Sequence, residues 1–226
     1  MREAGEPDDS LSALRALVGA EVEATLRRAA DLGFLGDAPI GDQIDHALGF
    51  VYATERQLGG WPGTAADLGT GGGTPGLVMG ASWPSCRVVL MDASQRRTDF
   101  LNEEIGGWEG WTGVAVVRGR AEELARDERY RERFEVVTAR SFGPPAVTAE
   151  CGAPLLAPGG VMVVSEPPGG QAGSRWPEEG LSELGLIPSA RVRFCDRFGY
   201  QVLVKSGATP DRYPRRVGIP AKRPLF

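Results

Sequence analysis

The sequence contains few of the residues from which several common kinds of site are built. It has one histidine and three cysteines, and Cys86, Cys151 and Cys195 are spaced neither as metal ligands nor as a redox pair. Only two lysines are present and the net charge is -5, which argues against a general nucleic-acid binder. No apolar run approaches the ~20 residues of a membrane span, and the acidic N-terminus differs from a signal peptide. We therefore expect a cytoplasmic protein with reduced cysteines, no metal and no membrane partner.

Helical patterns fill the first quarter of the chain. Apolar residues recur at helical spacing over Leu11–Ala29, with Ser10 as the expected N-cap. A second helical pattern spans Ile44–Leu58 and ends at a glycine pair. We expect an N-terminal helical extension over residues 1–60 and an α/β domain over residues 61–226.

The remainder alternates short apolar runs with helical segments, which is typical of a doubly wound parallel sheet. The expected strands are TAADLG, CRVVLMD, GVAVVRG, FEVVTAR and GGVMVVSE, with helices near 76–81, 94–106, 121–129 and 145–156. ARVRFC and YQVLVKS flank a turn that contains Gly199, and we expect them to form an antiparallel hairpin. A Rossmann-like, mostly parallel sheet with a C-terminal antiparallel hairpin is the general plan of class I S-adenosylmethionine-dependent methyltransferases.

A glycine-rich turn, ADLGTGGGTPG (66–76), follows the first expected strand and could hold a phosphate, a nucleoside or no ligand. Glycines at this edge of a sheet let backbone N–H groups approach a ligand closely. The register does not fit a dinucleotide fingerprint, because Thr74 stands where the third glycine after Gly69 and Gly71 is required, and no Walker lysine follows. S-adenosylmethionine fits better, since Asp67 can orient its ammonium group directly or through water.

Further segments agree with this cofactor. Asp92 ends the next expected strand and can accept hydrogen bonds from both ribose hydroxyls, although it could equally cap a helix. GRAEEL (119–124) falls where an adenine-contacting loop lies in methyltransferases, although Glu122 could also be an ordinary first-turn acid. LLAPGGVMVV resembles the helix, turn and fifth strand of this fold. Together these segments predict S-adenosylmethionine as the cofactor.

A family resemblance covers roughly residues 64–225. In order and spacing, the chain resembles the bacterial RsmG (GidB) methyltransferases in DLGTGGGTPGL, LMDASQRRTDFL, GRAEEL, FEVVTARSFGPP, LLAPGG and YPRRVGIPAKRPL. That family methylates guanine N7 in 16S ribosomal RNA. The resemblance implies ribosomal RNA or the small ribosomal subunit as the partner, and we expect the protein to be a monomer.

The resemblance also implies a role for individual residues. The backbone at Gly69 and Thr74 would contact the cofactor's amino-acid end, and Asp92 would hold the ribose. Arg140, after the fourth strand, would position the acceptor at the mouth of the site, unless it forms only a surface ion pair. The cofactor-binding candidates are Asp67, Gly69, Gly71, Gly73, Thr74, Asp92, Ala121, Glu122 and Arg140. The expected RNA contacts, unless the tail is merely solvated, are Arg215, Arg216, Lys222 and Arg223.

The expected chemistry requires few catalytic groups. Guanine N7 has a lone pair and carries no proton, so its methylation needs no general base and depends on holding donor and acceptor in line. We therefore expect Arg140 to position the acceptor. The only histidine, His46, is interpreted as a packing or helix-surface residue.

Two features favour other functions. The segment LGFLGDAPIGDQID is acidic, and a carboxylate at Glu166 would repel phosphate. These features favour a methyltransferase of the same fold that acts on a small molecule or another RNA. A third hypothesis is a non-catalytic protein that binds RNA or a partner and keeps the cofactor pocket only for folding, although the intact Asp92 and glycines speak against it.

Overall fold

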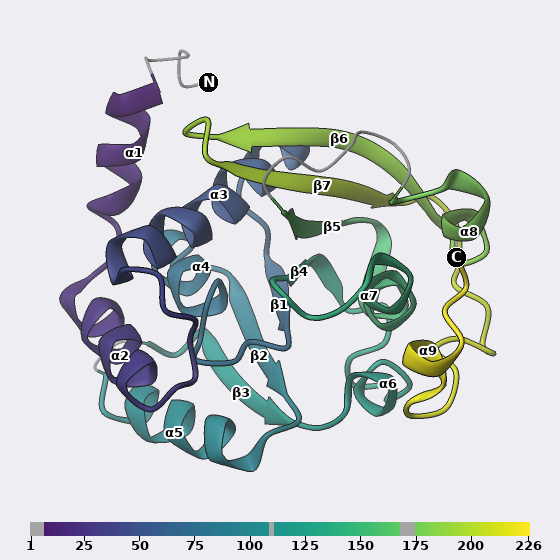
Figure 1. Cartoon of the computed structure of the whole chain (residues 1–226), viewed down its shortest axis with the longest axis horizontal. Helices are drawn as coiled ribbons and strands as arrows, with labels where there is room; N and C mark the ends of the chain where they lie inside the picture. Colours follow the sequence, from purple (N-terminus) through teal and green to yellow (C-terminus); the bar gives the residue numbers. More distant parts are fainter. Residues whose placement is uncertain (1–6, 109–110, 168–174) are drawn as a thin grey trace.

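The computed structural model describes residues 7–108, 111–167 and 175–226. Its strands are β1 (Thr64–Leu68), β2 (Arg87–Asp92), β3 (Val114–Arg118), β4 (Phe134–Ala139), β5 (Leu156–Glu166), β6 (Leu186–Phe194) and β7 (Phe198–Lys205). They form one sheet in the order β3-β2-β1-β4-β5-β7-β6 (Figure 1). The first five strands pair in parallel, whereas β7 runs antiparallel to both β5 and β6. The predicted fold class is confirmed.

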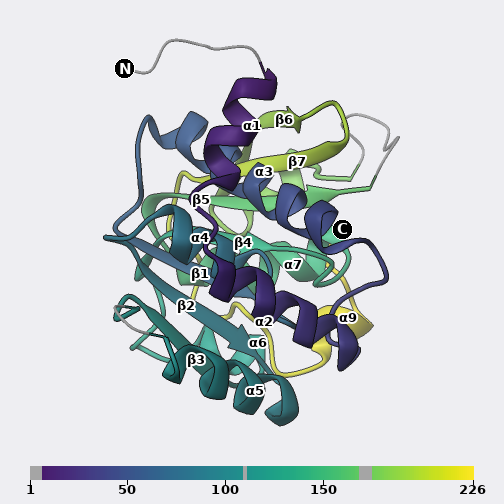
Figure 2. The same ribbon diagram turned by 90° about the vertical axis from the view of Figure 1, so that its left-hand side faces the viewer.

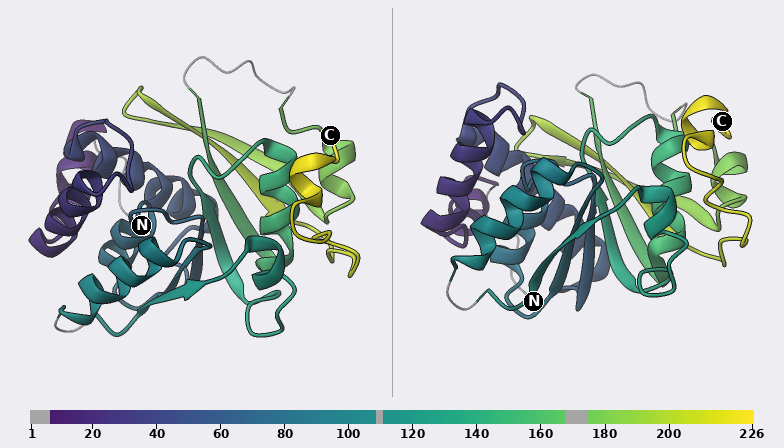
Figure 3. Two further views of the ribbon diagram at one scale, coloured as in Figure 1. Left: turned by 60° about the horizontal axis from the view of Figure 1, so that its bottom comes forward. Right: turned by 90° about the horizontal axis from the view of Figure 1, so that it is seen from below.

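Helices cover both faces of this sheet (Figure 3). One side carries α1 (Pro7–Arg15), α2 (Ala20–Asp31), α3 (Ile40–Leu58), α4 (Gly76–Ser82) and α5 (Gln95–Gly106). The other side carries α6 (Ala121–Leu124), α7 (Pro145–Gly152), the 3-10 helix η1 (Ala153–Leu155), α8 (Glu178–Ser182) and α9 (Ile219–Lys222). None of the helices in the described ranges has the length and apolar character that a membrane crossing requires.

Successive residues of the central strands enter two different hydrophobic cores. In β2, Val88 and Leu90 pack with residues of α3 and α4, whereas Val89 and Met91 pack on the opposite face. Side chains alternate between the faces of a strand. A parallel strand covered by helices on both sides therefore has a continuous apolar sequence, as VVLM does here.

α3 joins the N-terminal region to the sheet (Figure 2). It packs against β5, β6 and β7 and contributes buried residues to the same core as those strands. The Tyr200 hydroxyl on β7 donates a hydrogen bond of 2.6 Å to the carbonyl oxygen of His46 on α3. The division of the chain at residue 60 stays a prediction, and this contact shows that α3 and the sheet share one core.

The N-terminal helical pattern forms two helices rather than one. α1 ends at Arg15, and α2 begins after Gly19, whose extended backbone (φ -68°, ψ 163°) interrupts the helical run. Glycine lowers the stability of a helix interior, which explains why the run breaks there. The prediction of one continuous helical run over Leu11–Ala29 was therefore wrong. Ser10 lies inside α1 rather than at its N-cap.

Four further expectations need correction. α6 ends at Leu124 instead of residue 129, because the Asp127 carboxylate accepts the amide of Arg129 at 2.9 Å, a local bond that competes with the helix. α7 ends at Gly152 and continues only as η1. The hairpin turn lies at residues 195–197, so Gly199 belongs to β7. The Pro-Gly-Gly sequence lies within β5, where the pairing with β4 shifts register.

Gly49→Ala should destabilise the fold, although alanine is the better helix former. A Cβ atom at Gly49 would lie 2.0 Å from the Tyr200 hydroxyl oxygen, so α3 and β7 would have to separate. Overpacking of this kind costs about 1–3 kcal/mol in the free energy of unfolding. Urea titration of the purified variant measures the change.

Gly41→Ala in the same helix is the matched control. Its Cβ atom would lie 4.0 Å from the nearest heavy atom, an Arg15 nitrogen, so the substitution should be neutral or stabilise by up to about 1 kcal/mol. Equal effects of the two substitutions would show that α3 does not approach β7 closely at Gly49.

Candidate functional site

A cavity of about 240 Å³ lies at the carboxyl edge of the sheet, beyond β1, β2 and β3. The carboxylate residues Asp92 and Glu122 line it together with the apolar side chains of Met91, Leu124, Phe142 and Val147. A second cavity of about 180 Å³ is lined by polar groups of the glycine turn and by Arg140. Gly69 lines both cavities.

Asp67 lies beneath the glycine turn rather than facing either cavity. Its side chain is fully buried, and its two carboxylate oxygens accept the Gly76 amide at 2.9 Å and the Thr138 hydroxyl at 3.0 Å. Burial raises the pKa of this carboxyl to about 6. Asp67 is therefore enclosed beneath the turn and fixes its backbone, and its expected contact with the cofactor's ammonium group stays a prediction.

Asp92 has the position expected of a ribose-binding acid. It lines the larger cavity and is 6% exposed. Its oxygens accept the Gly71 amide at 2.9 Å and the Ser94 amide at 2.8 Å, and Arg97 approaches at 3.6 Å. Each carboxylate oxygen can accept two hydrogen bonds. Asp92 therefore orders the turn and the start of α5 while keeping acceptor capacity toward the cavity.

The three candidate glycines differ in what they face. Gly69 and Gly71 have positive φ (74° and 59°) and line cavities, which glycine permits without steric cost. A Cβ atom at Gly69 would lie 2.6 Å from the Phe142 ring. A Cβ atom at Gly73 would instead lie 2.5 Å from Leu77, and Gly73 lines neither cavity. Its backbone serves the packing of the turn on α4.

Arg140 connects the glycine turn to the N-terminal helices. Its guanidinium donates hydrogen bonds to the Thr74 hydroxyl and to the Gln43 side-chain oxygen of α3. No ion pair to Arg140 occurs among the described residues, so the alternative of a surface ion pair is not observed. Burial lowers the pKa of the guanidinium, and the charge of Asp67 opposes that shift. A partly buried cation thus lines the smaller cavity beside Thr74.

Ala121 and Glu122 line the far side of the larger cavity. Glu122 is 7% exposed, and its carboxylate accepts the backbone amide of Gly218 at 2.9 Å. Ala221 of α9 also lines this cavity. The C-terminal tail therefore reaches the side of the cavity where an adenine was expected, which sequence reasoning did not anticipate.

The four basic tail residues have different surroundings. Arg215 binds the fully buried Glu150, through its backbone amide at 2.7 Å and its guanidinium at 2.8 and 2.5 Å. The remaining three, Arg216, Lys222 and Arg223, are exposed and make no ion pair within the described ranges. Arg215 is thus held inside the protein, whereas the other three stay available to a partner.

His46 and Glu166 are both engaged within the chain. The His46 ring stacks on Phe198 with centroids 4.8 Å apart, and burial followed by the charge of Arg140 lowers its pKa to about 4. His46 is therefore a packing residue. Glu166 pairs with Arg175 at 2.7 Å and accepts the Trp176 indole N–H at 2.8 Å. The argument that Glu166 would repel phosphate loses its basis, because Arg175 neutralises the carboxylate.

The residues present fit S-adenosylmethionine. A mixed cavity with apolar walls and the two carboxylate residues Asp92 and Glu122 suits a nucleoside, and the adjoining polar cavity suits a charged amino-acid end. Asp92 would hold the ribose, Ala121 and Glu122 would border the adenine, and the backbone at Gly69 would lie where the two parts meet. The sequence analysis assigned no role to Gln43, Phe142 or Ala221. Phe142 and Ala221 lie within the motifs FEVVTARSFGPP and YPRRVGIPAKRPL, whereas Gln43 comes from α3, before the resembling segments begin.

Comparison with known proteins identifies a matching family. Residues 44–166 match the family described as "GidB: rRNA small subunit methyltransferase G". The chain is 35% identical to the ribosomal RNA small subunit methyltransferase G of Synechococcus elongatus, over 73% of this chain and 70% of that protein. It is 37% identical to the protein of that name from Carboxydothermus hydrogenoformans, over 71% of this chain and 70% of the relative.

Solved structures share the fold at low sequence identity. A SAM-dependent methyltransferase from Aquifex aeolicus superposes with a TM-score of 0.55 at 14% identity, over 79% of this chain and 96% of the other. An O-methyltransferase from Bacillus cereus in complex with SAH superposes with a TM-score of 0.53 at 14% identity, over 82% of this chain and 90% of the other. These likenesses establish the methyltransferase fold.

Asp67→Asn should remove a pH dependence from the stability of the fold. The pKa of Asp67 is about 6 in the folded chain, against an ordinary value of 3.8. Between these values the folded chain holds a proton that the unfolded chain has lost. The free energy of unfolding should therefore fall as the pH rises from about 4 to about 6, by about 3 kcal/mol at most, and then level off.

Denaturant titration of both proteins at several pH values measures this effect. The difference between wild type and Asp67→Asn isolates Asp67 from the other titrating groups. A difference that stays constant across the range would show that the Asp67 carboxyl is hydrated rather than enclosed under the turn.

Proposed function

Because the chain belongs to the rRNA small subunit methyltransferase G family, we propose that it methylates guanine N7 of 16S ribosomal RNA with S-adenosylmethionine as the cofactor. The protein would act in the cytoplasm, on the RNA or on the small ribosomal subunit. The observation that carries the proposal is the pair of cavities that meet at Gly69, with Asp92 in one and Arg140 in the other.

The residues around the cavities suit a reaction that needs no general base. S-adenosylmethionine supplies a methyl group on a positively charged sulfur, and guanine N7 attacks it with a lone pair. Two of the nearby titratable groups are unsuited to proton abstraction from a substrate. Asp67 is sealed beneath the turn, and His46 is stacked in an aromatic cluster. The contribution of the protein is then to hold the reactants in line.

Arg140 is the residue we assign to acceptor positioning. Its hydrogen bonds to Thr74 and Gln43 hold the guanidinium at the smaller cavity, next to the turn that would bind the cofactor's amino-acid end. A guanidinium there can donate to an oxygen of the base or of a phosphate while leaving N7 free. Arg140 would thus set the angle at which N7 approaches the methyl group.

RNA is the acceptor that the charges of the surface favour over a small molecule. The carboxylate that would have opposed a phosphate, Glu166, is paired with Arg175. The exposed Arg216, Lys222 and Arg223 lie on the tail that reaches the larger cavity, and could neutralise phosphates of a bound RNA.

Methyl transfer to small ribosomal subunits from a strain that lacks the modification tests this function. Purified wild type should place a labelled methyl group on guanine N7 of 16S RNA, located by mass spectrometry of RNA fragments. Arg140→Ala should lower the rate at least about 100-fold, because misplacing the reactants by about 1 Å has an effect of that size. The variant should still unfold cooperatively.

Arg129→Ala is the matched control, since Arg129 is an exposed arginine whose ion pair with Asp127 lies away from both cavities. Its rate should equal that of wild type. If the protein binds S-adenosylmethionine but transfers no methyl group to naked RNA or to small subunits at low salt, RNA is excluded as the acceptor. An Arg140→Ala rate within twofold of wild type would exclude Arg140 from positioning.

A further inference from the structure

The last part of the chain, which we call the C-terminal strap (residues 206–226), runs from the end of β7 over the outside of α6 and α7. In Figures 1 and 3 the strap is drawn in yellow, beside α6, α7 and α8 and away from the α1–α5 side. It has little regular structure beyond the short helix α9. Backbone bonds from Ser206 and Gly207 to the Gly185 carbonyl hold its first residues, and side chains of the rest of the protein bind the remainder.

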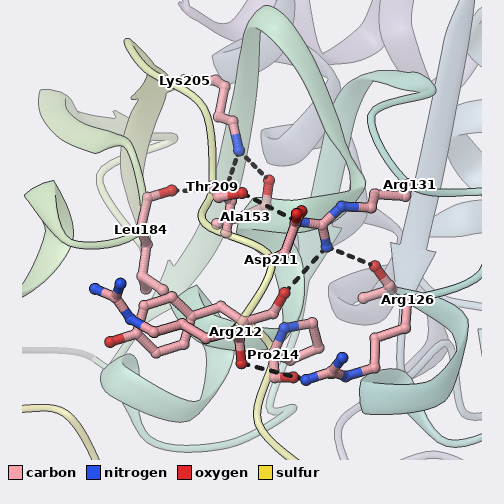
Figure 4. Close-up of polar contacts among 11 residues, drawn as sticks. Arg126, Arg131, Ala153, Leu184, Lys205, Thr209, Asp211, Arg212 and Pro214 are labelled. Atoms are coloured by element: carbon pink, nitrogen blue, oxygen red, sulfur yellow. Dashed lines mark hydrogen bonds and ion pairs between the residues drawn. The ribbon is translucent and has the colours of Figure 1, made fainter.

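Two arginines that follow α6 bind the strap through its backbone (Figure 4). Arg126 donates to the carbonyl oxygens of Pro214 at 2.8 Å and Arg212 at 3.2 Å. Arg131 donates to those of Tyr213 and Thr209, both at 3.0 Å. Bonds from a charged donor are stronger than those between neutral groups. Four strap carbonyls are thus fixed to the segment after α6.

The start of the strap is anchored by a buried lysine. Lys205, at the end of β7, is 3% exposed and donates to the Ala153 carbonyl at 2.7 Å and to the Thr209 hydroxyl. That hydroxyl donates in turn to the Leu184 carbonyl at 2.7 Å (Figure 4). The strap therefore leaves β7 in one direction, toward α7.

The middle of the strap is fixed by a carboxylate with no solvent exposure. Glu150 of α7 is 0% exposed and accepts three hydrogen bonds from Arg215, one from the backbone and two from the guanidinium. A buried charge is tolerated only when its partner and its hydrogen bonds are in place. Glu150 therefore specifies where Arg215 must lie.

The end of the strap reaches the larger cavity. Three residues after Arg215, the Gly218 amide donates to Glu122 at 2.9 Å, and three residues further Ala221 lines the cavity opposite Asp92. Glu122 lines the same cavity. The distance along the chain from Arg215 to Ala221 is short, so a shift of Arg215 would move this wall.

We propose that the strap forms one wall of the S-adenosylmethionine site, and that Glu150 and Arg215 are positioning residues that set the location of this wall. Arg215 thus serves cofactor binding rather than contact with RNA phosphates, in contrast to the exposed Arg216 and Arg223. The inference rests on the proposed function, because it takes the larger cavity to be the cofactor site.

The test compares the dissociation constant for S-adenosylhomocysteine with thermal stability, in two variants. Glu150→Ala with Arg215→Ala removes the hydrogen-bonded ion pair between these two residues, which we call the clamp, and leaves no unpaired buried charge. Ala221→Leu keeps the clamp and enlarges a side chain on the cavity wall, at an exposed position that tolerates bulk. Each variant should raise the dissociation constant at least about fivefold, the equivalent of about 1 kcal/mol.

Glu23→Ala with Arg27→Ala is the control, because it removes a Glu–Arg ion pair from α2, on the other side of the sheet from the strap. Its dissociation constant should match that of wild type. The slope of RNA affinity against salt should stay unchanged in the Glu150/Arg215 variant, and should fall in an Arg216→Ala, Arg223→Ala variant.

The possible results separate the inference from the proposed function. A clamp variant that melts at lower temperature but binds S-adenosylhomocysteine like wild type would show that Glu150 and Arg215 only stabilise the fold. If the clamp variant shows a smaller slope of RNA affinity against salt and an unchanged affinity for S-adenosylhomocysteine, Arg215 contacts RNA phosphates. If the clamp variant does not fold, the test rests on Ala221→Leu. A change of less than twofold in its dissociation constant for S-adenosylhomocysteine overturns the inference. Wild type that does not bind S-adenosylhomocysteine refutes the proposed function and the inference together.

Discussion

Two carboxylates at the ends of neighbouring strands hold the glycine turn on which the site depends. Asp67 on β1 accepts the Gly76 amide, and Asp92 on β2 accepts the Gly71 amide, both at 2.9 Å. A turn so rich in glycine has a large conformational entropy to lose, and these bonds oppose that loss. Asp67 does this out of contact with solvent, so only Asp92 keeps a face toward the cavity. Asp92 lies two residues beyond Leu90, the residue that pairs with Asp67, so it reaches the cavity while Asp67 supports the turn from below.

The rest of the site is added to this turn from distant parts of the chain. On one side, Gln43 of α3 meets Arg140, so the N-terminal helices reach the smaller cavity. On the other side, the C-terminal strap meets Glu122 and places Ala221 in the wall of the larger cavity. The central sheet carries the residues at its carboxyl edge that form the cofactor site, an arrangement that many methyltransferases share. The two terminal regions add walls to the two cavities that would hold the cofactor and the acceptor.

Much of this arrangement could be predicted from the sequence. Parallel strands end at one edge, so placing Gly69, Asp92 and Arg140 at the carboxyl ends of β1, β2 and β4 was enough to bring them to that edge. The alternation of side chains also places Asp67 on the same face as Ala65, whose core includes residues of α4. No local pattern could reveal the pairing of Glu150 with Arg215, which are 65 residues apart. A basic tail looks the same in sequence whether its arginines meet a buried carboxylate or a phosphate.

The central claim is that the cavity between Asp92 and α9 holds the nucleoside of S-adenosylmethionine. A crystal structure of the protein with S-adenosylhomocysteine tests it most directly. The account predicts ribose hydroxyls within hydrogen-bond distance of the Asp92 carboxylate, and an adenine bordered by Ala121 on one side and Ala221 on the other. Ligand density elsewhere, or a ribose bound by other residues while Asp92 contacts only Gly71 and Ser94, would contradict it.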